Sequence, residues 1–168
     1  KTVPGVKRVL PMLTKRMNAV HGVREVDCQL IGTFPYYPEF TQAEMVVGQF
    51  LNEEEENSKV SSCVISLPLA ERLFAGHNPL LEKIVVRGYE SSQVFQVKGV
   101  LQERVDAEKL PQLADSLGRT ITANVYVPLS TFNALYGVKN VDRSVGNLVL
   151  EAVELTEIRV EFETVDKV

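Results

Sequence analysis

The sequence contains no tryptophan, only two cysteines and two histidines, and no long apolar run. Cys28 and Cys63 lie far apart rather than in a C-x-x-C pair, so neither a zinc site nor a redox pair is predicted. His21 and His77 are each followed by turn residues, and we expect both at exposed turns, too few for a histidine-rich metal site. No segment approaches the roughly 20 consecutive apolar residues that a membrane-spanning helix needs.

Motifs of catalysis are missing from the sequence as well. It has no G-x-x-x-x-G-K-[ST] phosphate loop, no G-x-G-x-x-G, no H-E-x-x-H and no G-x-S-x-G. Carboxylates are plentiful, but nothing singles out two of them with the tuned environments that acid and base catalysis need. We therefore predict no catalytic residue, no cofactor and no metal, and we do not expect this chain to be an enzyme.

The charge pattern argues against one class of partner. The net charge is −4, and lysines and arginines do not cluster with aromatic residues, so the footprint of a nucleic-acid-binding domain is lacking. A 45% share of hydrophobic residues is ordinary for a globular protein. A chain of 168 residues can then bury its own core, as one domain or as one domain with two small lobes.

Short segments in which apolar and polar residues alternate predict a sheet. Residues 6–20 are predicted to form a strand with a break or bulge at Pro11, and residues 23–32 its hairpin partner. Further strands are predicted at residues 60–67, 84–87, 94–101, 122–127 and 148–163, with Phe95, Val97 and Leu101 on one face. Hairpins imply antiparallel pairs, and strand–helix–strand units add parallel or mixed ones.

Two short helices are predicted to cover one side of this sheet. Ser66 is expected to cap the first, and Gly76 to end it. Its apolar stripe consists of Leu69, Ala70, Leu73 and Phe74, and that of the second helix, before Gly137, of Phe132, Leu135 and Tyr136. The acidic run 53–56 indicates a solvated turn or a helix start, and residues 105–118 a surface excursion. The fold class is α+β, with a mixed, mainly antiparallel sheet.

The two cysteines allow two interpretations. Both lie in apolar, strand-like segments, so Cys28 and Cys63 can be two small buried hydrophobic residues, which the sequence favours. The alternative is a disulfide between two strands, which an oxidising compartment would permit and which would contribute about 3–4 kcal/mol.

The segment 34–40 carries four aromatic residues, Phe34, Tyr36, Tyr37 and Phe40. The prolines predict an extended loop over residues 34–38 rather than a helix. Aromatic residues are enriched in interface cores, so we interpret this loop as a partner contact; the alternative is that Phe34 and Tyr36 cover the sheet. If it is a contact, replacing Tyr36 and Tyr37 by Ser should abolish partner binding without lowering thermal stability.

Several segments, taken in order, resemble the periplasmic core domain of MacB-type ABC transporter permeases. They read P-G-V at 4–6, V-G-Q-F-L at 47–51, L-A-E-R-L-F-A-G at 69–76, F-Q-V-K-G-V-L at 95–101 and V-Y-V-P-L-S-T at 125–131. The family patterns are P-G-V-x-x-V-x-P, G-R-x-F-x-x-x-E, A-x-x-L-F-G, F-x-V-x-G-V and V-Y-V-P-L-S-T. The family's P-x-G-K element is P-L-L-E-K at 79–83 here, without its glycine, and residues 105–120 are less typical.

This resemblance implies a role in transport. Family permeases are dimers with four membrane helices per subunit, and this domain lies between the first and second, outside the inner membrane. A separate ATPase domain or subunit hydrolyses ATP, and the outer domain moves with it and docks an adaptor or an exported substrate. Residues 1–168 are then expected to be one extracytoplasmic domain trimmed from a larger permease and monomeric in isolation. The family has no catalytic residues in this domain to carry over.

Other functions remain open at this stage. Within the same superfamily the chain could belong to a lipoprotein-release permease or to a cell-division permease that activates wall hydrolases. From other classes, a secreted hydrolase or a small-ligand sensor domain would require a pocket with converging polar groups.

Overall fold

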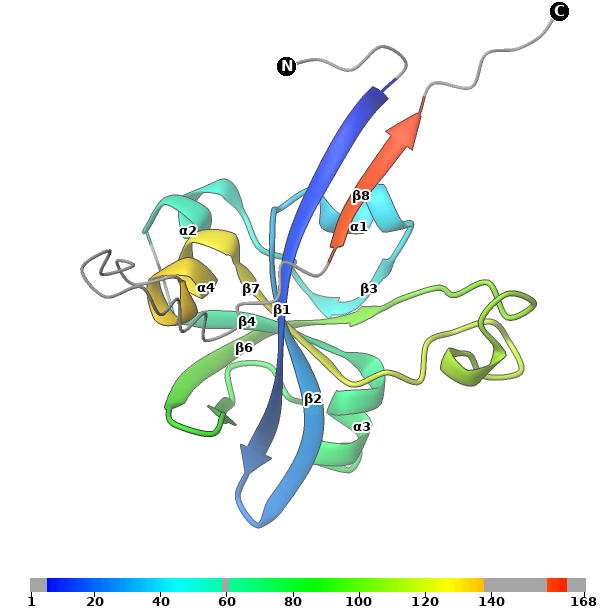
Figure 1. The fold of residues 1–168 in the computed structure, drawn as a ribbon. Helices are drawn as coiled ribbons and strands as arrows, with labels where there is room; N and C mark the ends of the chain where they lie inside the picture. The colour runs from blue at the N-terminus through cyan, green and yellow to red at the C-terminus, as the bar shows by residue number, and fades with distance from the viewer. Residues whose placement is uncertain (1–5, 59–60, 138–156, 163–168) are drawn as a thin grey trace, which may run out of the picture.

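The computed structural model describes residues 6–58, 61–137 and 157–162 (Figure 1). Its strands are β1 (Val6–His21), β2 (Arg24–Thr33), β3 (Glu44–Gly48), β4 (Ser62–Ser66), β5 (Lys83–Arg87), β6 (Ser92–Gln102), β7 (Asn124–Pro128) and β8 (Glu157–Phe162). Its helices are α1 (Tyr37–Thr41), α2 (Glu53–Ser58), α3 (Leu67–Phe74) and α4 (Leu129–Tyr136), with a short 3-10 helix at Pro111–Leu113.

The strands form one mixed sheet that closes on itself. β1 pairs with β2 and β5, β7 pairs with β2 and β4, and β6 pairs with β4 and β5, which completes a ring. β3 and β8 extend this ring by pairing with β6 and β1. The pairs β2–β7 and β4–β6 are parallel and the others antiparallel, so the predicted α+β fold with a mainly antiparallel sheet is confirmed.

Strand β1 runs the length of the domain. Its residues 13–21 pair with β2 in the predicted hairpin, and its earlier residues pair with β8. The predicted break at Pro11 is wrong: Pro11 pairs in register with Ile158, and the irregularity lies between Val6 and Arg8. Figure 1 shows the start of β1 and the end of β8 side by side at one end of the molecule, with the β1–β2 turn at the other. The segment 148–156 of the last predicted strand lies outside the described residues.

Two hydrophobic clusters lie on opposite faces of the same strands. Neighbouring residues alternate between them: Ile65 of β4 belongs to the cluster covered by α3 and α4, and Val64 to the cluster covered by α1. Leu30 and Ile31 of β2 and Val125 and Tyr126 of β7 divide in the same way. Because successive side chains of a strand point to opposite faces, one set of strands supports both cores.

The prediction that Leu101 shares a face with Phe95 and Val97 is wrong. Phe95 and Val97 lie in the first cluster, but Leu101 lies in the second. The register between β4 and β6 shifts after Val97, so that β6 contains one extra residue, a β-bulge. A bulge reverses the alternation of the side chains that follow it.

The apolar stripes of α3 and α4 pack on the first cluster as predicted, with Leu135 only partly buried, but the ends of α3 differ in part from the prediction. Ser66 occupies the N-cap position as predicted, but its side chain makes no cap hydrogen bond. Its hydroxyl donates to the Thr122 carbonyl at 3.1 Å and accepts from the Asn124 N–H at 2.8 Å. Helix α3 stops at Phe74 because Ala75 already adopts a left-handed conformation, with φ of 49°, one residue before Gly76. The Ser66 side chain therefore ties β4 to the start of β7 rather than bonding to the first turn of α3.

The sequence analysis did not predict helix α1 or strand β3, and it left open whether the acidic run 53–56 forms a turn or begins a helix. The predicted extended loop over 34–38 is wrong: residues 35 and 36 form a turn, closed by the Tyr37 N–H, which donates to the Phe34 carbonyl at 3.1 Å. Helix α1 follows at once, because Pro38 occupies its first turn, where a missing N–H costs nothing. Strand β3 is a largely exposed strand at the rim of the ring and so lacks a clear apolar alternation. The acidic run opens helix α2, in which Asn52 and Glu55 cap each other's backbone N–H at 2.9 Å.

Helix α4 packs against β2 at a glycine. A Cβ atom on Gly32 would lie 2.5 Å from the Cβ of Phe132, a buried residue of α4. We predict that Gly32→Ala lowers the free energy of unfolding by about 1–3 kcal/mol in urea denaturation, because the helix must shift. The control is Gly22→Asn, since Gly22 has φ of +59° and no neighbour within 4 Å, and asparagine tolerates this conformation. Equal stability of Gly32→Ala and wild type would contradict the packing.

Candidate partner-docking surfaces

The structure divides the four predicted contact residues between the surface and the core. Tyr37 is 1% exposed, whereas Phe34, Tyr36 and Phe40 are half-buried. Tyr36 and Phe40 pack against the second cluster with one side, and the rings of Phe34 and Tyr36 stack 5.6 Å apart. Tyr36 and Phe40 therefore cover the sheet, Phe34 stacks on Tyr36, and all three leave aromatic surface accessible. We call these three residues the aromatic surface.

Tyr37 is held in the core by aromatic and polar contacts. Its ring centroid lies 5.2 Å from that of Tyr126 and 5.9 Å from that of Phe50. Its hydroxyl donates to the carboxylate of Glu103, which also accepts from the side-chain amide of Asn124 at 3.1 Å. Burial, together with the nearby Glu103 carboxylate, raises the pKa of Tyr126 well above its ordinary value. Glu103 thus joins α1 to the residues that follow β6.

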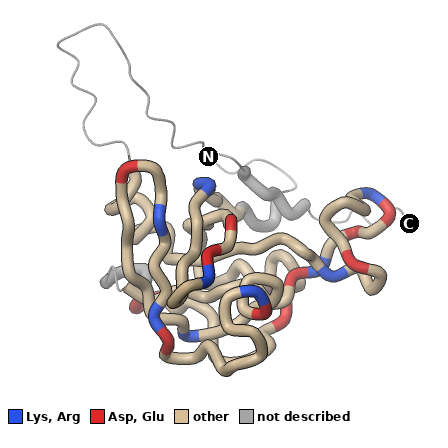
Figure 2. Tube along the Cα trace, turned by 90° about the horizontal axis from the view of Figure 1, so that it is seen from below, with Lys and Arg blue, Asp and Glu red and all other residues tan. Residues whose placement is uncertain are grey.

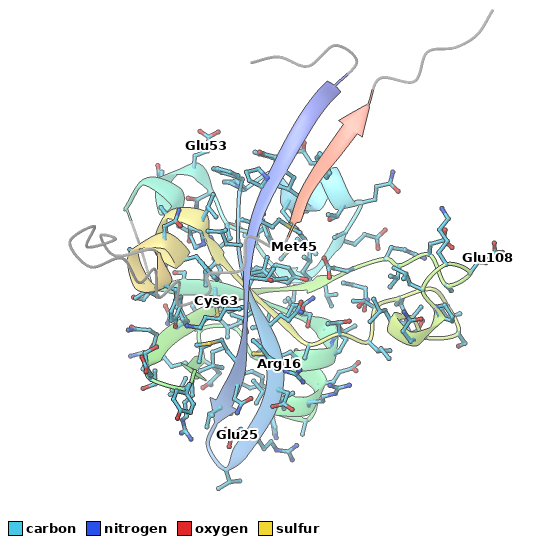
Figure 3. The ribbon with its side chains drawn as sticks, viewed as in Figure 1. Arg16, Glu25, Met45, Glu53, Cys63 and Glu108 are labelled. Atoms are coloured by element: carbon cyan, nitrogen blue, oxygen red, sulfur yellow. The ribbon has the colours of Figure 1, made fainter. Side chains whose placement is uncertain are left out.

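The chain from 103 to 121, which we call the arm, leaves the sheet between β6 and β7. This confirms the predicted surface excursion: Thr120 is the arm's only buried residue. Figure 1 shows the arm projecting from the side of the ring, and Figure 3 shows Glu108 far out on it. Four large aliphatic residues of the arm remain exposed, namely Leu110, Leu113, Leu117 and Ile121. The sequence analysis did not name these residues as functional candidates. Aliphatic residues that recur in an otherwise polar surface segment could have indicated an interaction surface.

The arm is ordered by hydrogen bonds of its own. Val105 donates to the Gly118 carbonyl at 2.9 Å, and Thr120 to that of Glu103 at 3.1 Å. The carboxylate of Asp115 accepts from the Arg119 N–H and from its Nε, both at 2.9 Å. These bonds, the backbone bond from Arg119 above all, hold the pKa of Asp115 below its ordinary value. The arm thus has a defined shape without a core.

A groove of about 510 Å³ lies at the base of the arm. Its walls are formed by Glu44, Met45 and Val46 of β3, by Leu67 and Gln102, and by Arg104, Leu117 and Arg119 of the arm. A second hollow of about 150 Å³ adjoins it and shares Leu67, Gln102 and Arg119. The groove thus combines aliphatic walls with the guanidinium groups of two arginines.

A third hollow, of about 450 Å³, lies at the β1–β2 turn beside the end of α3. The ring centroid of His21 lies 4.4 Å from that of Phe74, and its Nδ1 donates to the Lys83 carbonyl at 3.2 Å. The prediction of an exposed His21 is therefore wrong: this residue is half-buried, because the end of β1 packs on α3. The prediction of an exposed His77 is confirmed. Val23 at the turn is fully exposed.

Both cysteines are free and buried in the first cluster, so the preferred interpretation is confirmed and the disulfide is wrong. Figure 3 shows Cys63 among the strands of the sheet. The physical reason is that β7 lies between β2 and β4, and strands two places apart are about 9.5 Å apart, beyond the reach of a disulfide. Burial raises the pKa of the Cys28 thiol to about 12, so it is a poor nucleophile.

The described part of the chain has neither a one-sided charged face (Figure 2) nor a group of residues that could bind a metal ion. Figure 2 shows acidic and basic residues interspersed along the trace rather than gathered on one face. Within the described ranges, no three His, Cys, Asp or Glu residues are grouped so that they could hold a metal ion. None of the helices in these ranges has the length and apolar character to cross a membrane.

Solved structures share this fold. The chain matches the extracellular domain of the noncanonic ABC-type transporter YknZ from Gram-positive bacteria with a TM-score of 0.62 at 24% identity, over 80% of this chain and 61% of that one. It matches the periplasmic region of MacB from Actinobacillus actinomycetemcomitans with the same TM-score at 19% identity, over 82% and 55%. The fold is therefore that of extracytoplasmic domains of ABC-type transporters.

Sequence comparison identifies the family. The model of the MacB-like periplasmic core domain matches residues 1–163, so the chain belongs to this family. The macrolide export ATP-binding/permease protein MacB of Bdellovibrio bacteriovorus is 28% identical over 158 residues, which cover 94% of this chain and 22% of that protein. The chain thus spans about a fifth of the length of this curated relative.

Because Tyr37 is buried, replacing it by Ser should lower the stability of the domain, contrary to the expectation from the sequence. Tyr37→Ser opens a cavity and leaves Glu103 without one donor, so we predict a loss of about 3–5 kcal/mol in the free energy of unfolding, and about 1–2 kcal/mol for Tyr37→Phe. Tyr36→Ser should cost only about 1 kcal/mol. The measurement is urea denaturation, with the fully exposed Tyr89 changed to Ser as the control. A Tyr37→Ser variant as stable as the Tyr89→Ser variant would contradict this placement.

Proposed function

We propose that this chain is the extracytoplasmic domain of an ABC transporter permease, which couples ATP hydrolysis in the cytoplasm to export or to mechanical work outside the membrane. The family membership and the transporter folds support this role. The observation that carries it is the pairing of the start of β1 with the end of β8, with Val6 opposite Phe162. The two ends of the domain therefore leave it side by side, as required of a domain inserted between two membrane helices.

Strand β1 is suited to transmit motion between the two ends of the domain. Its 16 residues span roughly 50 Å at about 3.3 Å per residue. It pairs with β8 near the proposed membrane side and with β2 and β5 toward the β1–β2 turn. A displacement of the attached membrane helices would thus move the ring as one body, because the hydrogen bonds of a paired strand resist stretching and shear.

The ATPase would act through the membrane part of the permease, as a subunit or a domain of the same protein, and the permease would work as a dimer. The aromatic surface is the proposed contact for a periplasmic adaptor or an exported substrate. It presents the rings of Phe34, Tyr36 and Phe40 on a short helix and turn that Tyr37 anchors to the core. Rigid aromatic side chains on a fixed support lose little entropy on binding, which favours a contact role.

The full-length gene tests the permease assignment directly. We expect one apolar span of about 20 residues upstream of the chain and three downstream, because the domain would sit between the first and second of four membrane helices. The measurement is the gene sequence followed by mapping of the termini in the membrane. A secretion signal with no membrane span would overturn the assignment and would favour a secreted binding or hydrolase domain.

The aromatic surface is tested in the full-length permease with its ATPase. We expect the double variant Phe34→Ser and Tyr36→Ser to reduce export at least tenfold, while expression, folding and basal ATP hydrolysis stay within about twofold of wild type. Tyr89→Ser removes an equally aromatic but fully exposed side chain from the β5–β6 turn and serves as the control. Unchanged export in the double variant would remove the aromatic surface as the contact but leave the permease assignment intact.

A further inference from the structure

The arm presents apolar surface that the fold itself does not use. Leu117 is 65% exposed, and Leu110, Leu113 and Ile121 are also exposed. The arm has no core of its own; the Asp115–Arg119 pair and the backbone bonds at its base give it its shape. A projecting segment that is both ordered and aliphatic is typical of an interaction surface, since a loop without a partner needs neither property.

The groove at the arm's base adds charge to this surface. The guanidinium of Arg104 makes no hydrogen bond or ion pair with any other described residue, whereas Arg119 is bound to Asp115 at 2.9 Å. Arg104 stands cross-strand from Arg119, so two positive groups lie at adjacent positions of the arm. With Asp115 neutralising Arg119, the free positive charge of the groove is that of Arg104. Glu44 of β3 also lines the groove and repels anions, so a carboxylate is favoured only beside Arg104.

We propose that this groove binds an extended segment of a partner protein in which a carboxylate side chain is flanked by aliphatic ones. The carboxylate would bind Arg104, for which a planar guanidinium is well suited. The aliphatic side chains would pack on Leu117 of the arm and on Met45, Val46 and Leu67 of the opposite walls. This site is separate from the aromatic surface and does not depend on it or on the permease assignment.

The residue that fixes the arm on the domain is Glu103. It directly precedes Arg104, and its carboxylate is bound by Tyr37 and Asn124 in the second cluster. This anchorage sets the start of the arm against the core, so the groove exists before a partner arrives. A preformed groove avoids the entropy cost of ordering the arm on binding.

The test uses the full 168-residue chain and two fluorescein-labelled peptides, measured by fluorescence anisotropy. One peptide contains Val-Leu-Glu-Leu-Val and the other Val-Leu-Lys-Leu-Val, each between Gly-Ser ends. We expect the glutamate peptide to bind at least tenfold more tightly than the lysine peptide. Arg104→Glu should weaken the binding of the glutamate peptide at least tenfold and make the lysine peptide the tighter ligand. Leu117→Ser should weaken the binding of the glutamate peptide about tenfold.

Matched controls separate the groove from general surface effects. Lys109→Glu makes the same change of charge at an exposed position of the arm, and Leu81→Ser removes an exposed leucine elsewhere. Both should bind the glutamate peptide as wild type does. If Arg104→Glu melts at a lower temperature than wild type, Arg104→Gln replaces it, with the same loss of binding expected.

Three results of the binding assay would overturn the proposal. They are the absence of saturable binding up to 1 mM peptide, equal affinity for the two peptides, and a glutamate-peptide affinity that neither Arg104 variant changes. Sedimentation of the chain without peptide gives a further decision: self-association that Leu117→Ser abolishes would show that a second copy occupies this surface, and would equally overturn the proposed occupant.

Discussion

The pairing of β1 with three other strands is the constraint on which this domain depends. Its second half joins β2 and β5 and thereby closes the ring, and its first half holds β8. Closure leaves the six ring strands with a partner on both edges, which removes the open edges that attract other chains. Strand β1 also links the end of the domain where it pairs with β8 to the β1–β2 turn at the far end, so in the proposed function this one strand would carry the motion.

The shared strands explain how a chain of this size holds two cores. Each of β2, β4 and β7 gives alternate side chains to the two clusters, so the same backbone hydrogen bonds support α3 and α4 on one face and α1 on the other. The two proposed contact surfaces both border the second cluster. Tyr37 anchors the aromatic surface and Glu103 anchors the arm, and the hydrogen bond between these two side chains couples their positions.

Much of the architecture could be predicted because it depends on patterns of neighbouring residues in the sequence. The β1–β2 and β5–β6 hairpins, the apolar stripes of α3 and α4 and the excursion after β6 follow from alternation, turn residues and helical spacing. The errors lie where a distant residue decides a local outcome. Leu101 changes face because β6 bulges against β4, Ser66 bonds to β7 rather than to its own helix, and Ala75 ends α3 before the glycine does.

The sequence by itself determined the α+β class, the order of most elements and the family, because these depend on periodicity and on short motifs that are read along the chain. Only the tertiary structure decided that Tyr37 is a core residue while Phe34, Tyr36 and Phe40 stay accessible, and that Arg104 and Leu117 meet β3 in one groove. The reason is that burial and convergence depend on which strands become neighbours. The closing of the ring through β1 sets those neighbours, and no local pattern encodes it.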